Sequence, residues 1–200
     1  MTAVNDLSVM PREWLDALEM QPGHSLSMKE YKPVVAVTFT QEPLRGFGGE
    51  VLLTVRHPVT NLTHPNALSV PTRRTGTPEL DRQHWLDGQA EALVREKLNW
   101  RIAGARVQNL MTWQGESVIR QQDGEPVTER LTMINLYVPL ASATRIPWRT
   151  NEYSWAGFVP EKDAEEIIET RDASRLGLTS EPVVYGLCTQ STLRMLRETR

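Results

Sequence analysis

Several side chains in the middle of the chain have the chemistry to hold an anion. Arg73 and Arg74 are adjacent and follow a short apolar run, while Arg56 and His57 form a second basic pair. A guanidinium can grip two oxygens of a phosphate at once, and a charged donor makes a stronger hydrogen bond than a neutral one. We therefore take these residues as candidate ligand-binding residues for an anion. For each of them the alternative is an ordinary solvated charge on the surface.

Carboxylates that could hold a metal ion are scarcer in the same region. Mg²⁺ and Mn²⁺ are bound mainly through carboxylate oxygens, and Glu96 is the acid best placed to offer one. Glu91 lies five residues before it, so the two carboxylates do not share a helical face. Glu96 is therefore the candidate metal ligand, and the candidate catalytic residue if the protein is an enzyme. We expect no cofactor unless carboxylates elsewhere in the chain recruit Mg²⁺ or Mn²⁺.

The residues around Glu96 have an amphipathic pattern that predicts a helix over residues 89–98. Asn99 follows this helix, and Asn is the best residue after Gly for the left-handed conformation that ends one. We expect the apolar face of the helix to be deeply buried against a β-sheet. The residues on this face are Ala90, Leu93, Val94 and Leu98.

Strands and two further helices are predicted on either side of this helix. Runs of β-branched and apolar residues, bounded by turn residues, indicate the strands. The predicted strands are residues 33–40, 50–56, 67–71, 106–112, 116–120, 130–139 and 152–158. The Asp123-Gly124 pair is a strong hairpin signal between two of them. Helices are predicted from residue 160 and over residues 189–198.

The order of these elements is similar to that of Nudix hydrolases. In that family a strand ending in Arg and a short strand running into a Pro-Gly-Gly turn precede the Nudix helix. The family motif reads G-x5-E-x7-R-E-U-x-E-E-x-G-U, where U is a bulky apolar residue. Its glutamates hold the divalent ions that polarise a substrate diphosphate. The resemblance covers residues 28–171, although this chain has Pro-Thr-Arg-Arg at residues 71–74 in place of the turn.

Two alignments of the motif are open. The first matches its Arg-Glu pair literally to Arg95 and Glu96, but then Asn99 and Trp100 stand at the Glu-Glu pair. The second aligns Asn99 with the last Gly of the motif, which suits a left-handed helix cap. We prefer the second alignment because it also keeps a small residue and the apolar residues of the helix at their usual positions.

The preferred alignment leaves the metal-binding motif incomplete. Ala92 and Leu93 replace the Arg-Glu pair, and Glu96 and Lys97 replace the Glu-Glu pair. One carboxylate of three is kept, and the ammonium beside it would oppose a metal cation. His84 falls near the first Glu of the motif. The resemblance thus implies the fold without the usual metal chemistry.

The fold implied is α/β: a Nudix-like α/β/α sandwich around a mixed β-sheet, with an N-terminal helical appendage. We expect the appendage in residues 1–28, and a Nudix-like domain with C-terminal helices in residues 29–200. Two functions remain open. The domain could bind a phosphorylated or nucleotide-like ligand, or a protein partner, without classical hydrolysis. Alternatively it could be a divergent diphosphate hydrolase that recruits metal through Glu116, Glu129 or Glu152.

Composition fits a globular chain and gives no signal for other classes. The hydrophobic fraction is 40%, the charged fraction is 24% and the net charge is −3, so nothing indicates nucleic-acid binding. The single cysteine, Cys188, excludes an internal disulfide. We see no signal peptide and no apolar run long enough to cross a membrane, and therefore expect a cytoplasmic protein.

Overall fold

The computed structural model describes residues 32–42, 49–61, 64–102, 106–120, 126–140, 152–179, 181–182, 184 and 187–198. The predicted appendage in residues 1–28 and the Asp123-Gly124 turn lie outside these residues. No helix among the described residues combines the length and apolar character that a membrane span requires.

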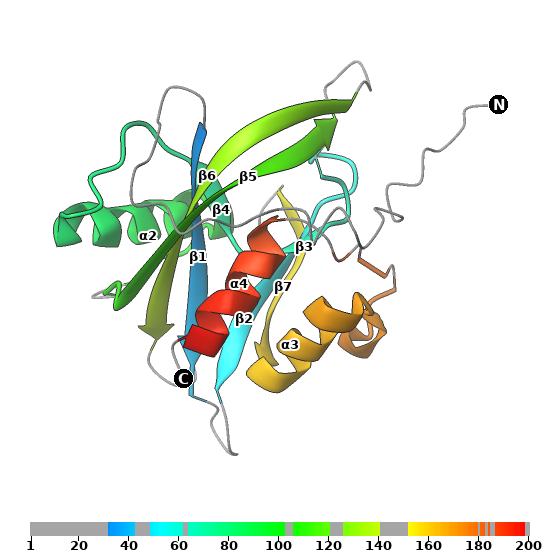
Figure 1. Ribbon diagram of the computed structural model, residues 1–200. Helices are drawn as coiled ribbons and strands as arrows, with labels where there is room; N and C mark the ends of the chain where they lie inside the picture. The colour runs from blue at the N-terminus through cyan, green and yellow to red at the C-terminus, as the bar shows by residue number, and fades with distance from the viewer. Residues whose placement is uncertain are drawn as a thin grey trace.

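The described residues form one seven-stranded mixed sheet (Figure 1). Its strands are β1 (Lys32–Gln41), β2 (Glu50–Arg56), β3 (Leu68–Ser69), β4 (Thr72–Arg74), β5 (Asn109–Arg120), β6 (Pro126–Leu140) and β7 (Tyr153–Pro160). The main strand order is β3-β2-β1-β6-β5, and β7 pairs with β2. Strands β1 and β6 are parallel along their length, whereas the other pairs are antiparallel.

The centre of this sheet is split. Strands β1 and β2 pair only at one end, where Thr40 faces Val51 and Gln41 faces Glu50. Toward the other end β4 pairs with β1, and β3 pairs with β2. The segment from β3 to β4 therefore fills the gap between two diverging strands. The same segment leads into the helix that carries Glu96, so the split sets where the candidate residues lie.

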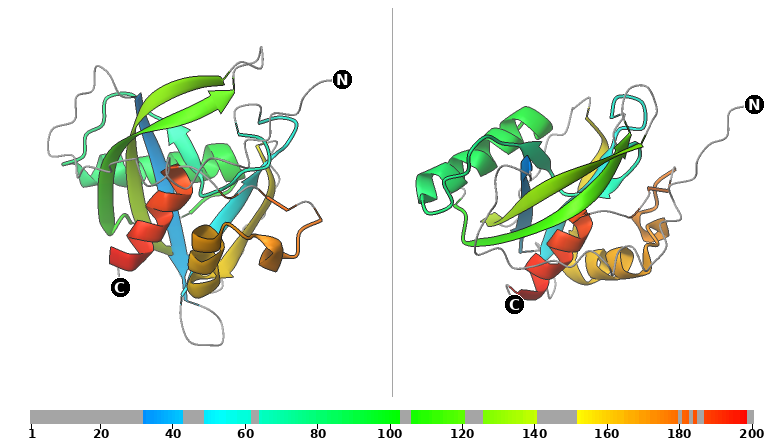
Figure 2. Two further views of the ribbon diagram at one scale, coloured as in Figure 1. Left: turned by 45° about the vertical axis from the view of Figure 1, so that its right-hand side comes forward. Right: turned by 45° about the horizontal axis from the view of Figure 1, so that its top comes forward.

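Helices cover both faces of the sheet (Figure 2). Helix α2 (Gln83–Leu98) packs on one face, and α3 (Glu161–Thr170) and α4 (Leu187–Glu198) pack on the other. A short 3-10 helix, Ser174–Leu176, follows α3. The four apolar residues predicted on the inner face of α2 are each 0% exposed. The predicted α/β/α sandwich around a mixed sheet is therefore confirmed.

Several elements differ from their predicted bounds, among them α2 and β5, and β4 (Thr72–Arg74) was not predicted as a strand. Helix α2 begins at Gln83 rather than at residue 89, although Gly88 lowers helix propensity there. Leu86 extends the buried face, and the Asp87 carboxylate accepts the Val107 backbone N–H at 2.8 Å, so tertiary contacts hold the first turns. Strand β5 is continuous where two strands were predicted, because Gly115 keeps its place in the pairing with β6.

Candidate anion-binding site

The C-terminal end of α2 lies against the split. Asn99 follows the helix in the left-handed region, with φ 48° and ψ 41°, as the preferred motif alignment requires. The backbone N–H at this cap bonds to the Val94 carbonyl, which closes the last turn. Trp100 packs against the core on the same side of the sheet, as does Trp85 from the first turn of the helix. The cap therefore holds the residues just before it, Glu96 and Lys97, at fixed places beside the sheet.

The residues at the motif positions do not fit a divalent metal ion. Leu93 is 0% exposed and belongs to the hydrophobic core. Glu96 forms an ion pair with Arg73 at 3.5 Å, and Lys97 supplies a positive charge instead of a carboxylate. Within the part of the chain that the structure describes, no group of three or more His, Cys, Asp or Glu could hold a metal. Hard cations need several oxygen ligands, and this corner does not bring them together.

The acidic side chains near the C-terminal end of α2 form ion pairs with lysine and arginine instead of binding a metal. The Lys97 ammonium contacts the Glu152 carboxylate just before β7, and both side chains are part-buried. The Glu152 carbonyl also accepts the His57 backbone N–H at 2.7 Å. Arg73 is tied to Glu96, and its side chain is only 23% exposed. This corner therefore balances its charge internally.

Arg73 and Arg74 lie on opposite faces of β4. Arg73 is opposite Val35, which belongs to the core beneath α2, and Arg74 is opposite Val34, which belongs to the core beneath α3 and α4. Successive residues of a strand point to opposite faces, so the two guanidiniums cannot grip one anion side by side. The arginine pair that the sequence suggested is thus divided between two environments.

Arg74 belongs to a group of cations around one carboxylate. Its Nη2 donates to Glu129 at 2.6 Å, and the Lys32 Nζ donates to the other oxygen of Glu129, also at 2.6 Å. Burial disfavours ionisation of Glu129, but the hydrogen bond and charge of Lys32 and the charge of Arg74 outweigh it and lower the pKa of that carboxyl. Both cations remain largely exposed, at 58% and 60% of their side chains.

Arg56 stands near the same group. Its Nη2 donates to the Thr72 hydroxyl at 2.8 Å, next to Arg73 on β4. The pKa of His64 is lowered to about 4, first by burial and then by the positive charge of Arg56, with Arg74 adding to the effect and Glu129 opposing it. His64 is thus neutral at pH 7 and lies among these charges. We call Lys32, Arg56 and Arg74, with Glu129 and His64 between them, the basic cluster.

The basic cluster carries a net positive charge. Its three cations are opposed by a single carboxylate, because His64 is uncharged at neutral pH. A guanidinium has five N–H donors, and one hydrogen bond is resolved for each of Arg56 and Arg74 within the described residues. The cluster therefore has both the charge and the donors to receive phosphate oxygens.

The remaining candidates have other positions. The His57 Nδ1 accepts the backbone N–H groups of Val59 at 3.2 Å and Thr60 at 3.3 Å, so it shapes the turn after β2. His84 is exposed in the first turn of α2. The side chain of Glu116 lies outside the described residues.

Sequence reasoning missed the partners that complete these groups. Lys32 lies opposite Leu131 in the parallel pairing of β1 with β6, which brings it close to Glu129. Periodicity within one strand does not reveal which distant strand lies beside it. The contact between Lys97 and Glu152 was missed for the same reason, although Lys97 had been placed in the motif and Glu152 had been named as a possible metal ligand.

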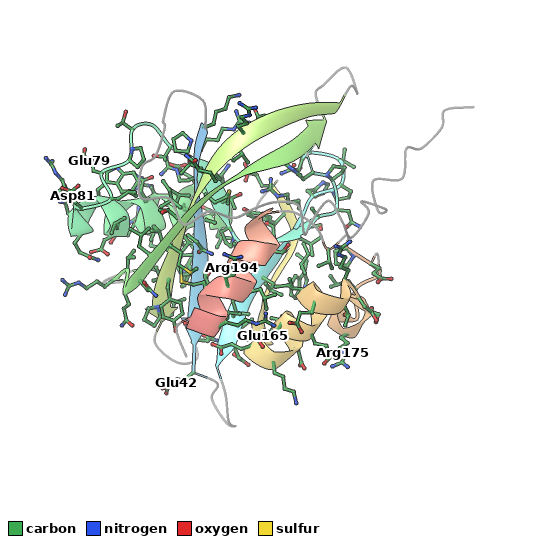
Figure 3. The ribbon with its side chains drawn as sticks, in the orientation of Figure 1. Glu42, Glu79, Asp81, Glu165, Arg175 and Arg194 are labelled. Atoms are coloured by element: carbon green, nitrogen blue, oxygen red, sulfur yellow. The ribbon has the colours of Figure 1, made fainter. Side chains whose placement is uncertain are left out.

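The charged residues labelled in Figure 3 do not belong to the basic cluster. Glu79 and Asp81 precede the first turn of α2, and a helix of this length separates its two ends by about 24 Å. Arg175 lies beside α3 and pairs with Glu166 at 2.5 Å. Its side chain is 52% exposed, which resembles the exposure of Arg74. Arg175 is therefore a matched control for the cations of the basic cluster.

Solved Nudix structures share this arrangement of sheet and helices. No family model matches the chain, and no curated protein sequence is a significant match. A Nudix hydrolase from Alicyclobacillus acidocaldarius is similar with a TM-score of 0.53 and 13% identity, over 84% of this chain and 90% of that chain. The M. smegmatis Nudix hydrolase RenU has a TM-score of 0.52 and 12% identity, over 85% of each chain.

A third similar structure is the E. coli dihydroneopterin triphosphate pyrophosphohydrolase, with a TM-score of 0.51 and 12% identity. The match covers 85% of this chain and 99% of that chain. Identities this low establish the fold and leave the chemistry to the residues of the site. The chain therefore has a Nudix-like fold.

Proposed function

We propose that this protein binds a phosphorylated, nucleotide-like ligand through side-chain cations and does not hydrolyse it by metal-assisted chemistry. The observation that carries the proposal is the exchange of charge at the motif positions. Lys97 stands where the preferred alignment places a carboxylate, and it contacts Glu152. The motif positions thus lack the set of carboxylates that holds a metal, and the positive charge for a phosphate comes instead from the basic cluster, where three cations face one carboxylate.

The basic cluster is the part of the site best suited to the anion. Lys32 and Arg74 expose more than half of their side chains, and Arg56 adds a third cation nearby. Arg73, in contrast, is tied to Glu96 and mostly buried. A ligand phosphate would find a net positive charge at the cluster and a balanced charge at the end of α2.

The similar E. coli structure supports the ligand class. That protein is a pyrophosphohydrolase of a compound bearing a triphosphate, on a fold that matches most of the present chain. A phosphorylated compound is therefore a reasonable ligand here.

A divergent hydrolase is the weaker alternative. Two of the acids that could have supplied extra metal ligands are already held by cations: Glu129 by Lys32 and Arg74, and Glu152 by Lys97. A metal ion would have to displace these ammonium and guanidinium groups before it could coordinate the carboxylates.

The binding test is calorimetric titration of inorganic pyrophosphate and ADP, without divalent metal, into the wild type and its variants. We expect dissociation constants in the millimolar range or below. Arg74→Ala and Arg56→Ala should each weaken binding about tenfold to hundredfold, because a charge-assisted hydrogen bond is worth about 1.5–3 kcal/mol. Arg175→Ala should bind as the wild type does. Failure of both ligands to bind, or equal binding by Arg74→Ala, would overturn the proposal and favour a protein partner.

The second test concerns turnover. We expect negligible Mg²⁺- or Mn²⁺-dependent hydrolysis of nucleoside diphosphate derivatives, followed by chromatographic detection of the nucleoside monophosphate product. The control variants are Glu96→Gln and Glu152→Gln. Robust metal-dependent turnover that either substitution abolishes would establish the divergent hydrolase instead.

A further inference from the structure

The ion pair of Lys97 with Glu152 joins two elements that are far apart in the sequence. Lys97 lies in the last turn of α2, and Glu152 immediately precedes β7. Their side chains are 23% and 42% exposed, so the contact is partly shielded from water. Shielding strengthens such a pair relative to one that is fully solvated. The pair therefore fixes the start of β7 against the end of the helix.

A second link passes from Glu152 to the loop after β2. The Glu152 carbonyl accepts the His57 backbone N–H at 2.7 Å, and the His57 ring then organises the following turn through Val59 and Thr60. The position of the Glu152 backbone thus determines where the loop leaves β2. Lys97 is thus connected to that loop through Glu152.

Arg56 is the residue at the junction. The pairing of β2 with β7 shifts its register between Val55 and Arg56, and Arg56 is then paired with Tyr153, the residue after Glu152. Such an irregularity turns a side chain away from the direction that regular pairing would give it. The guanidinium of Arg56 reaches Thr72, on the side of the sheet where the basic cluster lies. Its placement depends on where residues 152 and 153 are held.

We infer that Lys97 is a positioning residue for the anion site, acting through Glu152 on Arg56 and His57. The effect of Lys97 on ligand binding rests on the proposed function, whereas its effect on the position of the loop after β2 does not. An ion shared between the helix and β7 would need carboxylates on both elements. Here the cation is the Lys97 side chain of the helix itself, so this link between the helix and β7 needs no metal ion.

The structural part is tested without ligand, by hydrogen exchange of the backbone amides of residues 57–60. Lys97→Met removes the ammonium but keeps an unbranched chain. We expect about fivefold faster exchange in this segment, since a partly exposed ion pair is worth about 1 kcal/mol. Lys97→Arg should restore the wild-type rate. Lys162→Met, on the exposed face of α3, is the matched control and should leave the segment unchanged.

The functional part is tested by titration with pyrophosphate. Lys97→Met and Glu152→Gln should each weaken binding about fivefold, and the double variant should be no weaker than either single one, because both act through the same link. Lys97→Arg should recover the affinity. Additive losses in the double variant would show that Lys97 contacts the ligand directly and would overturn the inference.

The two proposals fail separately. Unchanged exchange of residues 57–60 in Lys97→Met overturns the positioning role, whatever the ligand does. Faster exchange in a protein that binds neither pyrophosphate nor ADP supports the link between α2 and the loop, and overturns only the proposed anion binding.

Discussion

Restoring a glutamate at Leu93 should unfold or severely weaken the protein. In the preferred alignment Leu93 stands at a carboxylate position of the motif, so the substitution Leu93→Glu rebuilds part of it. The structure places this side chain in the core beneath α2, at 0% exposure. Lys97, one helical turn away, is already engaged with Glu152. The new carboxylate would therefore be buried without a partner.

The expected loss follows from two terms. Removing a buried leucine side chain gives up roughly 1.5–3 kcal/mol of apolar transfer free energy. Keeping a carboxyl with an ordinary pKa near 4.3 protonated at pH 7 costs about 3.7 kcal/mol more. The total of about 5–7 kcal/mol approaches the whole stability of a typical domain, which is about 5–15 kcal/mol.

Urea unfolding followed by circular dichroism measures this loss. Arg95→Glu is the control: the residue is exposed on the same helix, so a cost below about 1 kcal/mol is expected. The folded Leu93→Glu variant binds more protons than its unfolded chain, so its deficit should shrink by about 1.4 kcal/mol per pH unit between pH 7 and about 4.3. A deficit below about 1 kcal/mol at pH 7 would refute the burial argument and the helix register with it.

Two further predictions concern the helix cap and His64. Asn99→Ala should lower the free energy of unfolding by about 1 kcal/mol, because Ala tolerates the left-handed φ of 48° poorly, whereas Asn99→Gly should not lower it; urea unfolding distinguishes them. Unfolded His64 takes up a proton below pH 6.5, whereas the folded residue does so only near pH 4, so stability should fall by up to about 3 kcal/mol as pH decreases through that window. Urea unfolding at several pH values should show a smaller fall in His64→Asn, and an equal fall would contradict the assignment.

Local pattern was enough to predict most of the fold. Strand β1 is a continuous apolar run because both of its faces are buried, whereas α2 has an apolar periodicity because it buries one face. The left-handed Asn99 was predictable since few residue types adopt that conformation. The start of α2 was not predictable from local sequence, because it is stabilised by the hydrogen bond between Asp87 and Val107, which lie 20 residues apart.

The candidate site was predictable only as a set of residue types. Arg73 and Arg74 were both candidates for binding an anion, but strand alternation sends them to different faces once β4 is recognised as a strand. Glu129, which pairs with Lys32 and Arg74, lies on β6, and Glu152, which pairs with Lys97, immediately precedes β7. Strand pairing brings both acids close to cations that are distant in the sequence. Which strands pair depends on the whole sheet, so the local sequence does not predict ion pairs of this kind.

The source of positive charge decides what such a site can do. A divalent metal both neutralises a diphosphate and lowers the pKa of a bound water, which makes that water a nucleophile. Ammonium and guanidinium groups neutralise the same oxygens but do not coordinate and ionise water. At the end of α2, Lys97 and Arg73 form ion pairs with Glu152 and Glu96, whereas the basic cluster has an excess of positive charge. We therefore expect the basic cluster to bind an anion with an affinity that responds to salt, which screens exposed charges. We expect no metal-assisted activation of water at the end of α2, where the described residues do not bring metal ligands together.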